Sequence, residues 1–182
     1  MPTIEQIIAL VIILVGTIIL FSISWPNIRG APWVPTRMKK VQKMLTLANI
    51  QPGELVYDLG CGDGRIIVMA AQKFNARAVG IEIDLFRYLW CQFLITVLGL
   101  RRKVKVVYGD FFKKNISDAN VVFCYLLQST NDRLEEKLIK ELQPNTRVIS
   151  NTFMFHGLPL DETEGISGIY VYRIDDGIVG HI

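Results

Sequence analysis

The chain has 182 residues, which is enough for one domain with a full hydrophobic core and a short appendage. Its 20 Lys and Arg residues stand against 17 Asp and Glu residues, so the net charge is only +3 and a nucleic-acid partner is not expected. The three cysteines are widely spaced and odd in number, so they offer neither a disulfide framework nor a zinc pattern, and no metal site is predicted.

The N-terminal segment is the most apolar part of the chain. Residues 7–23 form an uncharged run of 17 residues that is followed by Trp25, which is just long enough to cross a bilayer. Glu5 is the only early charge and residues 22–26 make a poor cleavage site, so a retained membrane anchor over residues 1–28 is favoured over a cleaved signal peptide. A buried helix is the remaining alternative, but no polar stripe supports it.

Basic residues follow this apolar segment closely, while no acidic residue occurs between Glu5 and Glu54. Basic flanks stay on the cytoplasmic side of a membrane. The sequence therefore predicts a single-pass membrane protein with one transmembrane helix, and with the domain of residues 29–182 facing the cytoplasm. The basic stretch also suits anionic lipid headgroups, although a solvated helix face explains it equally well. These basic residues are Arg29, Arg37, Lys39, Lys40 and Lys43.

The rest of the chain alternates between strand and helix patterns. Residues 30–35 form a stiff, extended connector because Pro32 and Pro35 disfavour a helix, and Thr36 then caps a helix that runs to about Asn49. Such alternation predicts an α/β domain with a mostly parallel sheet that is covered on both faces. Strands are expected at 55–59, 78–82, 104–108, 120–125, 146–152 and 168–174, and further helices at 64–74, 84–98 and 130–142.

A glycine-dense turn joins the first strand to the helix that follows it. Asp58 and Leu59 end the strand, and Gly60, Gly62 and Gly64 come at every second position. Glycines remove side chains where a ligand must approach the backbone and tolerate a positive φ, and the amides at the next helix start are unpaired donors. Cys61 lies inside this turn, where a small neutral filler is a better interpretation than a nucleophile.

Glu82 ends the next apolar strand, 24 positions after Asp58, which suits one strand–helix–strand unit. A carboxylate at the tip of the neighbouring strand accepts both hydroxyls of a ribose in dinucleotide folds. A nicotinamide or flavin site is the rival interpretation, but its G-x-G-x-x-G spacing differs from the spacing here. An ordinary strand–turn–helix is the other alternative, and Glu82 argues against it.

The helix expected at 84–98 carries no charge from Tyr88 to Leu100, and Arg101, Arg102 and Lys103 follow at once. Thirteen residues are too few to span a bilayer. The favoured interpretation is a core helix buried between the sheet and its neighbours. The alternative is a surface that touches the bilayer or an apolar membrane partner.

Residues 58–64 together with Glu82 resemble the cofactor-binding residues of class I S-adenosylmethionine-dependent methyltransferases. Asp110 and Phe111 occupy the place where that family puts an acidic residue near the adenine amine. The resemblance implies a Rossmann-like, seven-stranded, mostly parallel sheet and S-adenosylmethionine as cofactor. It implies that the cofactor contacts Pro35, Thr36, Asp58, Leu59, Gly60, Cys61, Gly62, Asp63, Gly64, Glu82, Ile83, Asp110 and Phe111.

A narrower resemblance covers about residues 32–174 and points to small protein-lysine methyltransferases, both the archaeal broad-specificity enzymes and the mitochondrial group that modifies the c-ring protein of ATP synthase. It is carried by residues 32–36, 56–67, 125–127 and 141–150. The resemblance implies that the lead-in around Thr36 closes over the active site. The chain departs from these relatives after the fifth strand, and this leaves the sixth strand in doubt.

Methyl transfer from a sulfonium is an in-line displacement, so the protein chiefly aligns the acceptor and excludes water. Tyr125, at the end of the fourth strand, is predicted to line the acceptor channel, with packing against the cofactor as an even alternative. Gln128 and Asn131 are candidates for polar contacts to the acceptor. An adenine or amide N-methyltransferase usually carries Asn or Asp before Pro-Pro and an aromatic residue here, and this chain lacks that pattern.

The function expected from these residues is methyl transfer from S-adenosylmethionine to a lysine side chain of a protein, and the short connector would place the active site near membrane proteins. One alternative is methylation of a lipid or a small apolar acceptor. The other is a non-catalytic module that keeps the cofactor pocket for stability or assembly.

Overall fold

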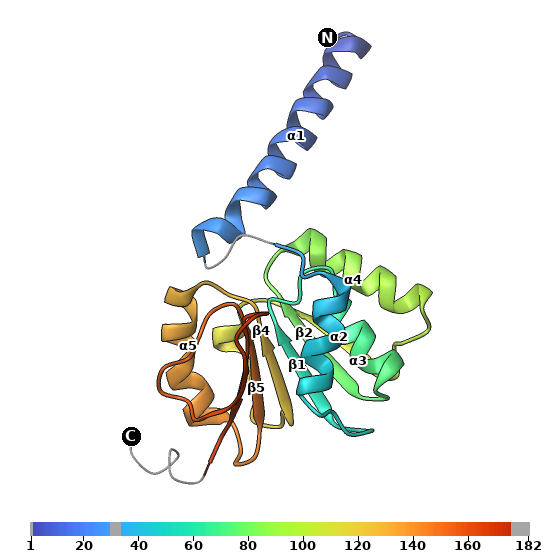
Figure 1. Ribbon diagram of the computed structural model, residues 1–182. Coiled ribbons are helices and arrows are strands. Elements are labelled where there is room, and N and C mark those ends of the chain that lie inside the picture. Colours follow the sequence, from blue (N-terminus) through green and yellow to red (C-terminus); the bar gives the residue numbers. More distant parts are fainter. Residues whose placement is uncertain (1, 30–33, 176–182) are drawn as a thin grey trace.

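The computed structural model describes residues 2–29 and 34–175, so most of the connector expected at 30–35, including Pro32, lies outside the described residues. Figure 1 shows a long N-terminal helix, α1, followed by an α/β domain. The helices are α1 Ile4–Arg29, α2 Met38–Leu47, α3 Arg65–Lys73, α4 Leu85–Val97 and α5 Gln128–Glu141, with the 3₁₀ turn η1 Phe111–Lys113. The strands are β1 Leu55–Leu59, β2 Arg77–Glu82, β3 Val104–Tyr108, β4 Val121–Cys124, β5 Arg147–Asn151, β6 Leu160–Glu164 and β7 Ile169–Arg173.

The seven strands form one sheet in the order β3-β2-β1-β4-β5-β7-β6. The first five strands in the chain are parallel, and β7 and β6 are antiparallel to their neighbours. The chain builds outward from β1 to β2 and β3, and then returns to place β4 on the other side of β1. This reversal opens a crevice at the carboxyl ends of β1 and β4, which is where α/β sheets bind ligands. The predicted Rossmann-like, mostly parallel sheet is confirmed.

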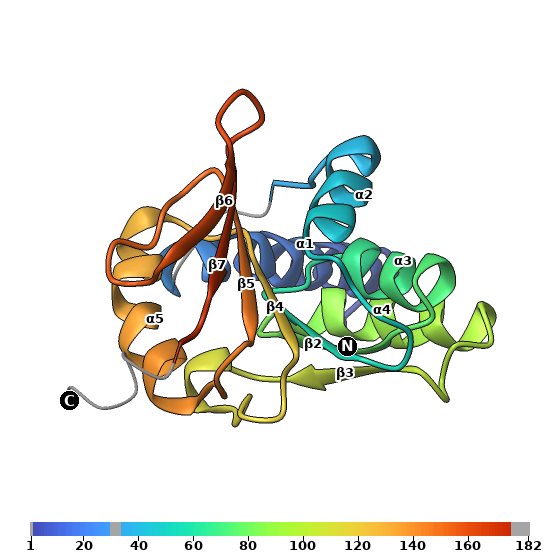
Figure 2. The ribbon, with the colours of Figure 1, turned by 60° about the horizontal axis from the view of Figure 1, so that its bottom comes forward.

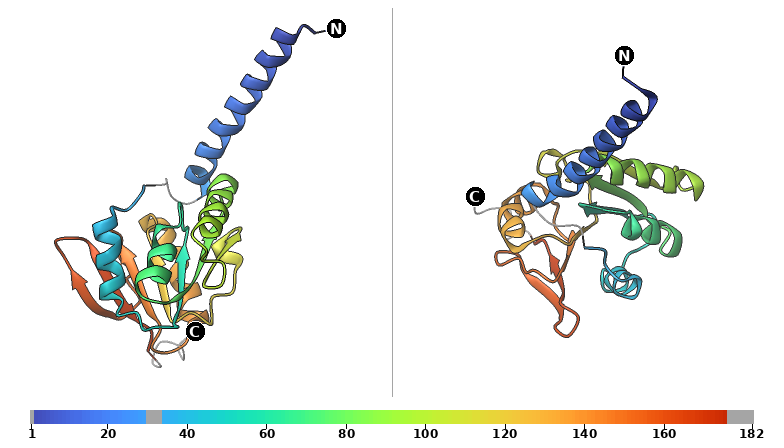
Figure 3. Two further views of the ribbon diagram at one scale, coloured as in Figure 1. Left: turned by 90° about the vertical axis from the view of Figure 1, so that its right-hand side faces the viewer. Right: turned by 90° about the horizontal axis from the view of Figure 1, so that it is seen from above.

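Helices cover both faces of the sheet, as the view from above in Figure 3 shows: α5 lies on one side, and α2, α3 and α4 lie on the other. The central strands β4 and β5 are buried along their whole length. This explains the continuous apolar sequence of β4, whereas β5 also buries Arg147, Ser150 and Asn151, which all make hydrogen bonds. One core cluster includes Met44, Ile67 and Phe123, and a second cluster on the α5 side includes Leu134 and Tyr172.

The sixth strand, in doubt from the sequence, lies at the edge of the sheet as the outer half of the β6–β7 hairpin (Figure 2). Its side chains are mostly exposed and three of them are acidic: Asp161, Glu162 and Glu164. Charged side chains on an edge strand discourage pairing with another chain. This strand lacks the apolar alternation that predicts a half-buried strand, so its sequence resembles that of a loop.

The prediction of a transmembrane helix in residues 1–28 is corrected by the structure. Among the residues that it describes, no helix has both the length and the apolar character needed to cross a membrane. The prediction rested on a 17-residue run, which is the short end of what a bilayer requires. The helix that contains this run, α1, carries Glu5 in its first turn and ends at Arg29.

Arg147 ties the start of β5 to the segment between α2 and β1. Its guanidinium donates to the carbonyl oxygens of Ala48 and Asn49 over 2.7 and 2.8 Å, and it pairs with the carboxylate of Glu54. Arg147 is buried, its bond to Ala48 is buried with it, and its contacts with Asn49 and Glu54 are partly buried. The planar, five-donor guanidinium suits such a three-way contact because its donors point in fixed directions.

We expect Arg147→Met to lower the free energy of unfolding by about 2–4 kcal/mol, because it leaves Glu54 and two carbonyl groups without their donor. Urea unfolding followed by circular dichroism measures the change. The control is Arg173→Met, which removes the exposed ion pair with Asp161 and is expected to cost less than about 1 kcal/mol. Equal losses of unfolding free energy in the two variants would contradict the conclusion that the buried contacts of Arg147 stabilise the fold.

Candidate active site

The glycine turn after β1 exposes backbone at the carboxyl edge of the sheet. Gly60, Gly62 and Gly64 all have left-handed φ angles of 78°, 57° and 82°, which side chains rarely adopt. The amides of Gly60 and Cys61 both donate to the carbonyl of Ile81, so the turn is fastened to β2. The predicted ligand-binding turn is therefore present as a fixed loop of bare backbone.

Glu82 is buried at the tip of β2 and connects this turn to the start of α4. One carboxylate oxygen accepts the amide of Gly62 and the other accepts the amide of Asp84, each over 2.8 Å. Burial raises the pKa of Glu82, and these two backbone hydrogen bonds oppose that rise. Each carboxylate oxygen has a second lone pair, so the group still accepts further hydrogen bonds from a ligand hydroxyl.

Asp58, on β1, is 4 % exposed and lies close enough to Glu82 for the two charges to repel. Burial raises its pKa to about 8, and the negative charges of Glu82 and Asp63 contribute to the rise. Within the described part of the chain, Asp58 forms no ion pair. Glu82 is partly compensated by Arg87, whose guanidinium lies 4.0 Å from its carboxylate. The buried carboxyl group of Asp58 favours a positively charged ligand, and this fits a cofactor that carries an ammonium and a sulfonium group.

Cys61 fills the space between the turn and β2. Its thiol hydrogen-bonds with Cys91, which together with burial raises the pKa of Cys61 well above its usual value. The thiol is therefore neutral, in agreement with a filler and not with a nucleophile. A Cβ atom on Gly80 would lie 2.6 Å from the sulfur of Cys61, so Gly80 is required for this packing. Gly80 was not among the predicted site residues, although a glycine inside an apolar strand signals a close approach.

The lead-in segment is held against the turn and against β5. The carbonyl of Thr36 accepts a hydrogen bond from the guanidinium of Arg65, and its hydroxyl accepts one from Asn151 over 3.4 Å. Thr36 and Asn151 are both buried, and Asn151 stands at the carboxyl end of β5. Pro35, just before Thr36, is exposed. Arg65 and Asn151 were not predicted as site residues. Asn151 could have been found from the sequence, because it is a polar residue at the tip of a buried strand.

The tip of β3 lies next to the tip of β2, since the amide of Gly109 donates to the backbone carbonyl of Glu82 over 2.9 Å. Asp110 follows and caps the η1 turn by accepting the amide of Phe112. Phe111, like Ile83 after Glu82, is half-buried. Adjacent strand tips thus bring Asp110, Phe111 and Ile83 to the same edge as Glu82, as the sequence predicted.

Three acceptor candidates stand after β4. Tyr125 is half-buried, and Gln128 begins α5 and donates to Asp132 and to the carbonyl of Met154. Asn131 is fully buried, and its amide donates to Ser150 and to the carbonyl of Phe153. Gln128 and Asn131 therefore connect α5 to the segment after β5. Among the described residues, the amide oxygen of Asn131 is a buried polar atom without a hydrogen-bond partner.

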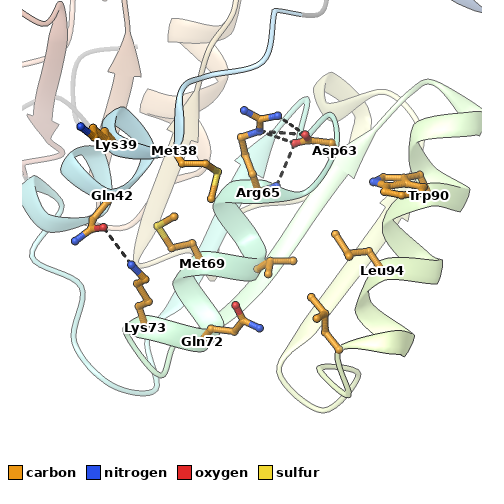
Figure 4. Close-up of a pocket in the computed structure, with 12 residues that line it drawn as sticks. Met38, Lys39, Gln42, Asp63, Arg65, Met69, Gln72, Lys73, Trp90 and Leu94 are labelled. Carbon is orange, nitrogen blue, oxygen red and sulfur yellow. Dashed lines mark hydrogen bonds and ion pairs between the residues drawn. The ribbon is translucent and has the colours of Figure 1, made fainter.

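Asp63 stands in the glycine turn, near enough to Asp58 to raise the pKa of Asp58, and its carboxylate is turned to Arg65, to which it is bound through Nε over 2.8 Å. Figure 4 shows this pair at one end of a groove of about 520 Å³ between α2, α3 and α4. The groove is lined by Met38, Lys39, Gln42, Asp63, Arg65, Val68, Met69, Gln72, Lys73, Trp90, Leu94 and Leu98. It is thus distinct from the edge that carries Asp58 and Glu82.

Comparison with known proteins identifies the family. Residues 58–162 match the model of the ANTKMT methyltransferase domain. The chain is 42 % identical over 151 residues to a protein-lysine N-methyltransferase of Saccharolobus islandicus, and the match covers 82 % of this chain and 89 % of the relative. It is 30 % identical over 166 residues to the lysine N-methyltransferase of Homo sapiens that is named for the c-type subunit of ATP synthase, covering 86 % of this chain and 70 % of the relative.

A solved structure supports the same conclusion. An RNA methyltransferase from Salinibacter ruber, in complex with S-adenosyl-L-homocysteine, is 39 % identical to this chain with a TM-score of 0.74, and the match covers 82 % of this chain and 96 % of that one. Together with the glycine turn and the carboxylates of Asp58 and Glu82, these matches show that the chain belongs to the ANTKMT methyltransferase domain family and is an S-adenosylmethionine-dependent methyltransferase.

Proposed function

We propose that this enzyme transfers the methyl group to the side-chain amine of a lysine in a protein. The arrangement after β4 carries the proposal. Tyr125, a half-buried residue directly after β4, offers a hydroxyl, and Asn131, buried in the first turn of α5, has an amide oxygen without a partner among the described residues; such hydrogen-bond acceptors suit an amine. The relatives named as protein-lysine methyltransferases support it, as does the modest net charge, which offers little attraction for a nucleic acid.

We assign each part of the cofactor to residues of the carboxyl edge. Asp58 and the bare backbone from Gly60 to Gly64 hold the methionine end, where an ammonium group relieves the repulsion between buried carboxylates. Glu82 accepts the ribose hydroxyls with its remaining lone pairs. Asp110 and Phe111 hold the adenine.

The bound cofactor supplies an electrophilic methyl group. The protein must present the lysine amine in its neutral form, although the reference pKa of lysine is about 10.4. Partial desolvation and the neighbouring positive charge both favour the neutral amine. Tyr125 then orients the amine by accepting one of its hydrogens. Asn131, held by Ser150 and Phe153, fixes the wall of the acceptor channel.

Asp58 gives cofactor binding a defined dependence on pH. Because its pKa in the free protein is raised to about 8, a cationic ligand that needs the ionised carboxylate must displace a proton below that pH. We expect the affinity measured by calorimetry to rise by up to about tenfold per pH unit from about pH 6 to about pH 8. The control Asp58→Asn should bind weakly and lack this rise, and the same rise in that variant would contradict the assignment.

Tyr125→Phe tests the acceptor side. Removing the hydroxyl takes away one hydrogen bond to the amine, so we expect kcat to fall by about tenfold while the cofactor Kd stays unchanged. Tyr170→Phe, on β7, is the matched control and should leave kcat unchanged. A larger cofactor Kd with unchanged kcat would instead show that Tyr125 only packs against the cofactor.

The acceptor class is tested by transfer of a radiolabelled methyl group into an extract of cells that lack the enzyme. The extract is separated into protein, RNA and lipid, and the protein is hydrolysed to amino acids. We expect label in methyl-lysine, and none with Asp58→Asn. Label in RNA or lipid would overturn the lysine assignment, and failure to bind cofactor by calorimetry would favour a non-catalytic module.

A further inference from the structure

Helix α4 presents a row of large apolar side chains to solvent. Leu85, Phe86, Leu89, Trp90, Phe93 and Val97 are between 48 % and 65 % exposed. They recur at intervals of four residues along two neighbouring rows, so they form one continuous stripe from the first turn of the helix to the last. Scattered exposed apolar residues are normal, but a continuous patch of this kind marks an interaction surface.

The opposite side of α4 fixes the direction of this stripe. Cys91 and Ile95 are buried, and the amide of Gln92 donates to the carbonyl of Val106 on β3. Asp84 caps the helix by accepting the amide of Arg87. The expectation that α4 is buried between the sheet and its neighbours is therefore correct for one side only, and the helix cannot rotate to hide the other.

The charged residues within and just after α4 in the chain all have one sign. From residue 85 to residue 109 the chain contains no acidic residue, whereas it contains five cationic ones. Three of them, Arg101, Arg102 and Lys103, are exposed in the turn that follows the C-terminal end of α4. The guanidinium of Arg101 is fixed to the hydroxyl of Thr96 over 2.9 Å, so it stays beside the last turn of the helix. Asp63, which lines the groove beside Trp90, is the acidic residue at this border, and it is paired with Arg65. An apolar stripe with a mainly basic border fits an anionic, partly apolar partner.

The groove of Figure 4 extends the same surface toward α2 and α3. Trp90, Leu94 and Leu98 form its α4 wall. Lys39 and Lys73 stand on the other sides, and the ammonium of Lys73 donates to Gln42 over 3.1 Å. The groove also holds the Asp63–Arg65 ion pair, so Lys39 and Lys73 supply its excess positive charge. Trp90 belongs both to the groove and to the stripe, so the two features form one surface.

We propose that this surface, the exposed stripe of α4 with its basic border, lies on the surface of an anionic lipid bilayer. Helices that lie in the plane of a membrane interface combine Trp, Phe and Leu on the buried face with Lys and Arg beside it. The rings of Trp90 and Phe93, whose centroids are 6.0 Å apart, enter the boundary between headgroups and acyl chains. Arg101, Arg102 and Lys103 contact the lipid phosphates.

This contact has a consequence for the active site. α4 begins three residues after Glu82, so the lipid-facing surface and the cofactor edge share one strand–helix junction. Docking on lipid through α4 holds the carboxyl edge of the sheet close to the membrane surface. The inference does not depend on which acceptor is methylated.

The experiment places an environment-sensitive fluorophore on the stripe of the full chain. Phe93→Cys is labelled with a nitrobenzoxadiazole dye, and Ile166→Cys, at the exposed β6–β7 turn, is the matched control; the native cysteines are all buried. Vesicles of phosphatidylcholine are compared with vesicles of equal parts phosphatidylcholine and phosphatidylglycerol. We expect the dye at position 93 to brighten at least about twofold on anionic vesicles, and the dye at 166 to stay unchanged.

Two further measurements sharpen the result. A lipid-borne quencher in the acyl chains should quench the dye at position 93 and not the dye at 166, which shows that α4 itself enters the bilayer whatever other segments do. Arg101→Glu combined with Arg102→Glu should weaken the anionic response by about tenfold or more. An unchanged dye at position 93, or an equal response on neutral vesicles, would overturn the proposal. If the fluorescence of the dye at position 93 rose with protein concentration in the absence of vesicles, the proposal would be overturned, because the surface would then bind a second copy of this chain.

Discussion

The active site depends on the way in which one carboxylate, that of Glu82, joins three parts of the backbone. It stands at the tip of β2, and its oxygens accept the amide of the glycine turn after β1 and the amide at the start of α4. The amides of Gly60 and Cys61 already fasten the turn to Ile81 of β2, and Glu82 adds a further fixed point at Gly62, where glycine itself restrains the backbone little. The same group is the ribose acceptor in our proposal, so structural support and the proposed binding are not separable at this position.

A second set of polar contacts joins segments that are far apart in the chain. Thr36 is bound to Arg65 beside the glycine turn and to Asn151 at the tip of β5, so the lead-in before α2 is fixed across the carboxyl edge of the sheet. On the other side of that edge, Gln128 and Asn131 bind the segment after β5. The edge is therefore surrounded by segments from both ends of the domain, each held by hydrogen bonds that are at least partly buried.

Much of this arrangement could be predicted from the sequence, because the glycine turn and Glu82 follow from backbone requirements that are local. The hydrogen bond between Thr36 and Asn151 could not be predicted, since it joins residues 115 positions apart and depends on the sheet order.

The position of β6 could not be predicted either, because an acidic, exposed edge strand has no apolar alternation. From Tyr88 onward α4 carries no charge, so its sequence does not mark a solvent side, and only packing against β3 shows which side is exposed. The prediction of a transmembrane helix was wrong because a count of apolar residues near the minimum length decides little.

The raised pKa of Asp58 affects the enzyme beyond its resting state. Below about pH 8 the free site holds a proton on Asp58, with Glu82 beside it, so a cationic ligand takes the place of that proton. On our assignment of the cofactor, the methyl donor brings two positive charges to this site and the demethylated product brings one, because the sulfonium charge is lost with the methyl group. The proton would therefore return to Asp58 more readily in the product complex than in the donor complex.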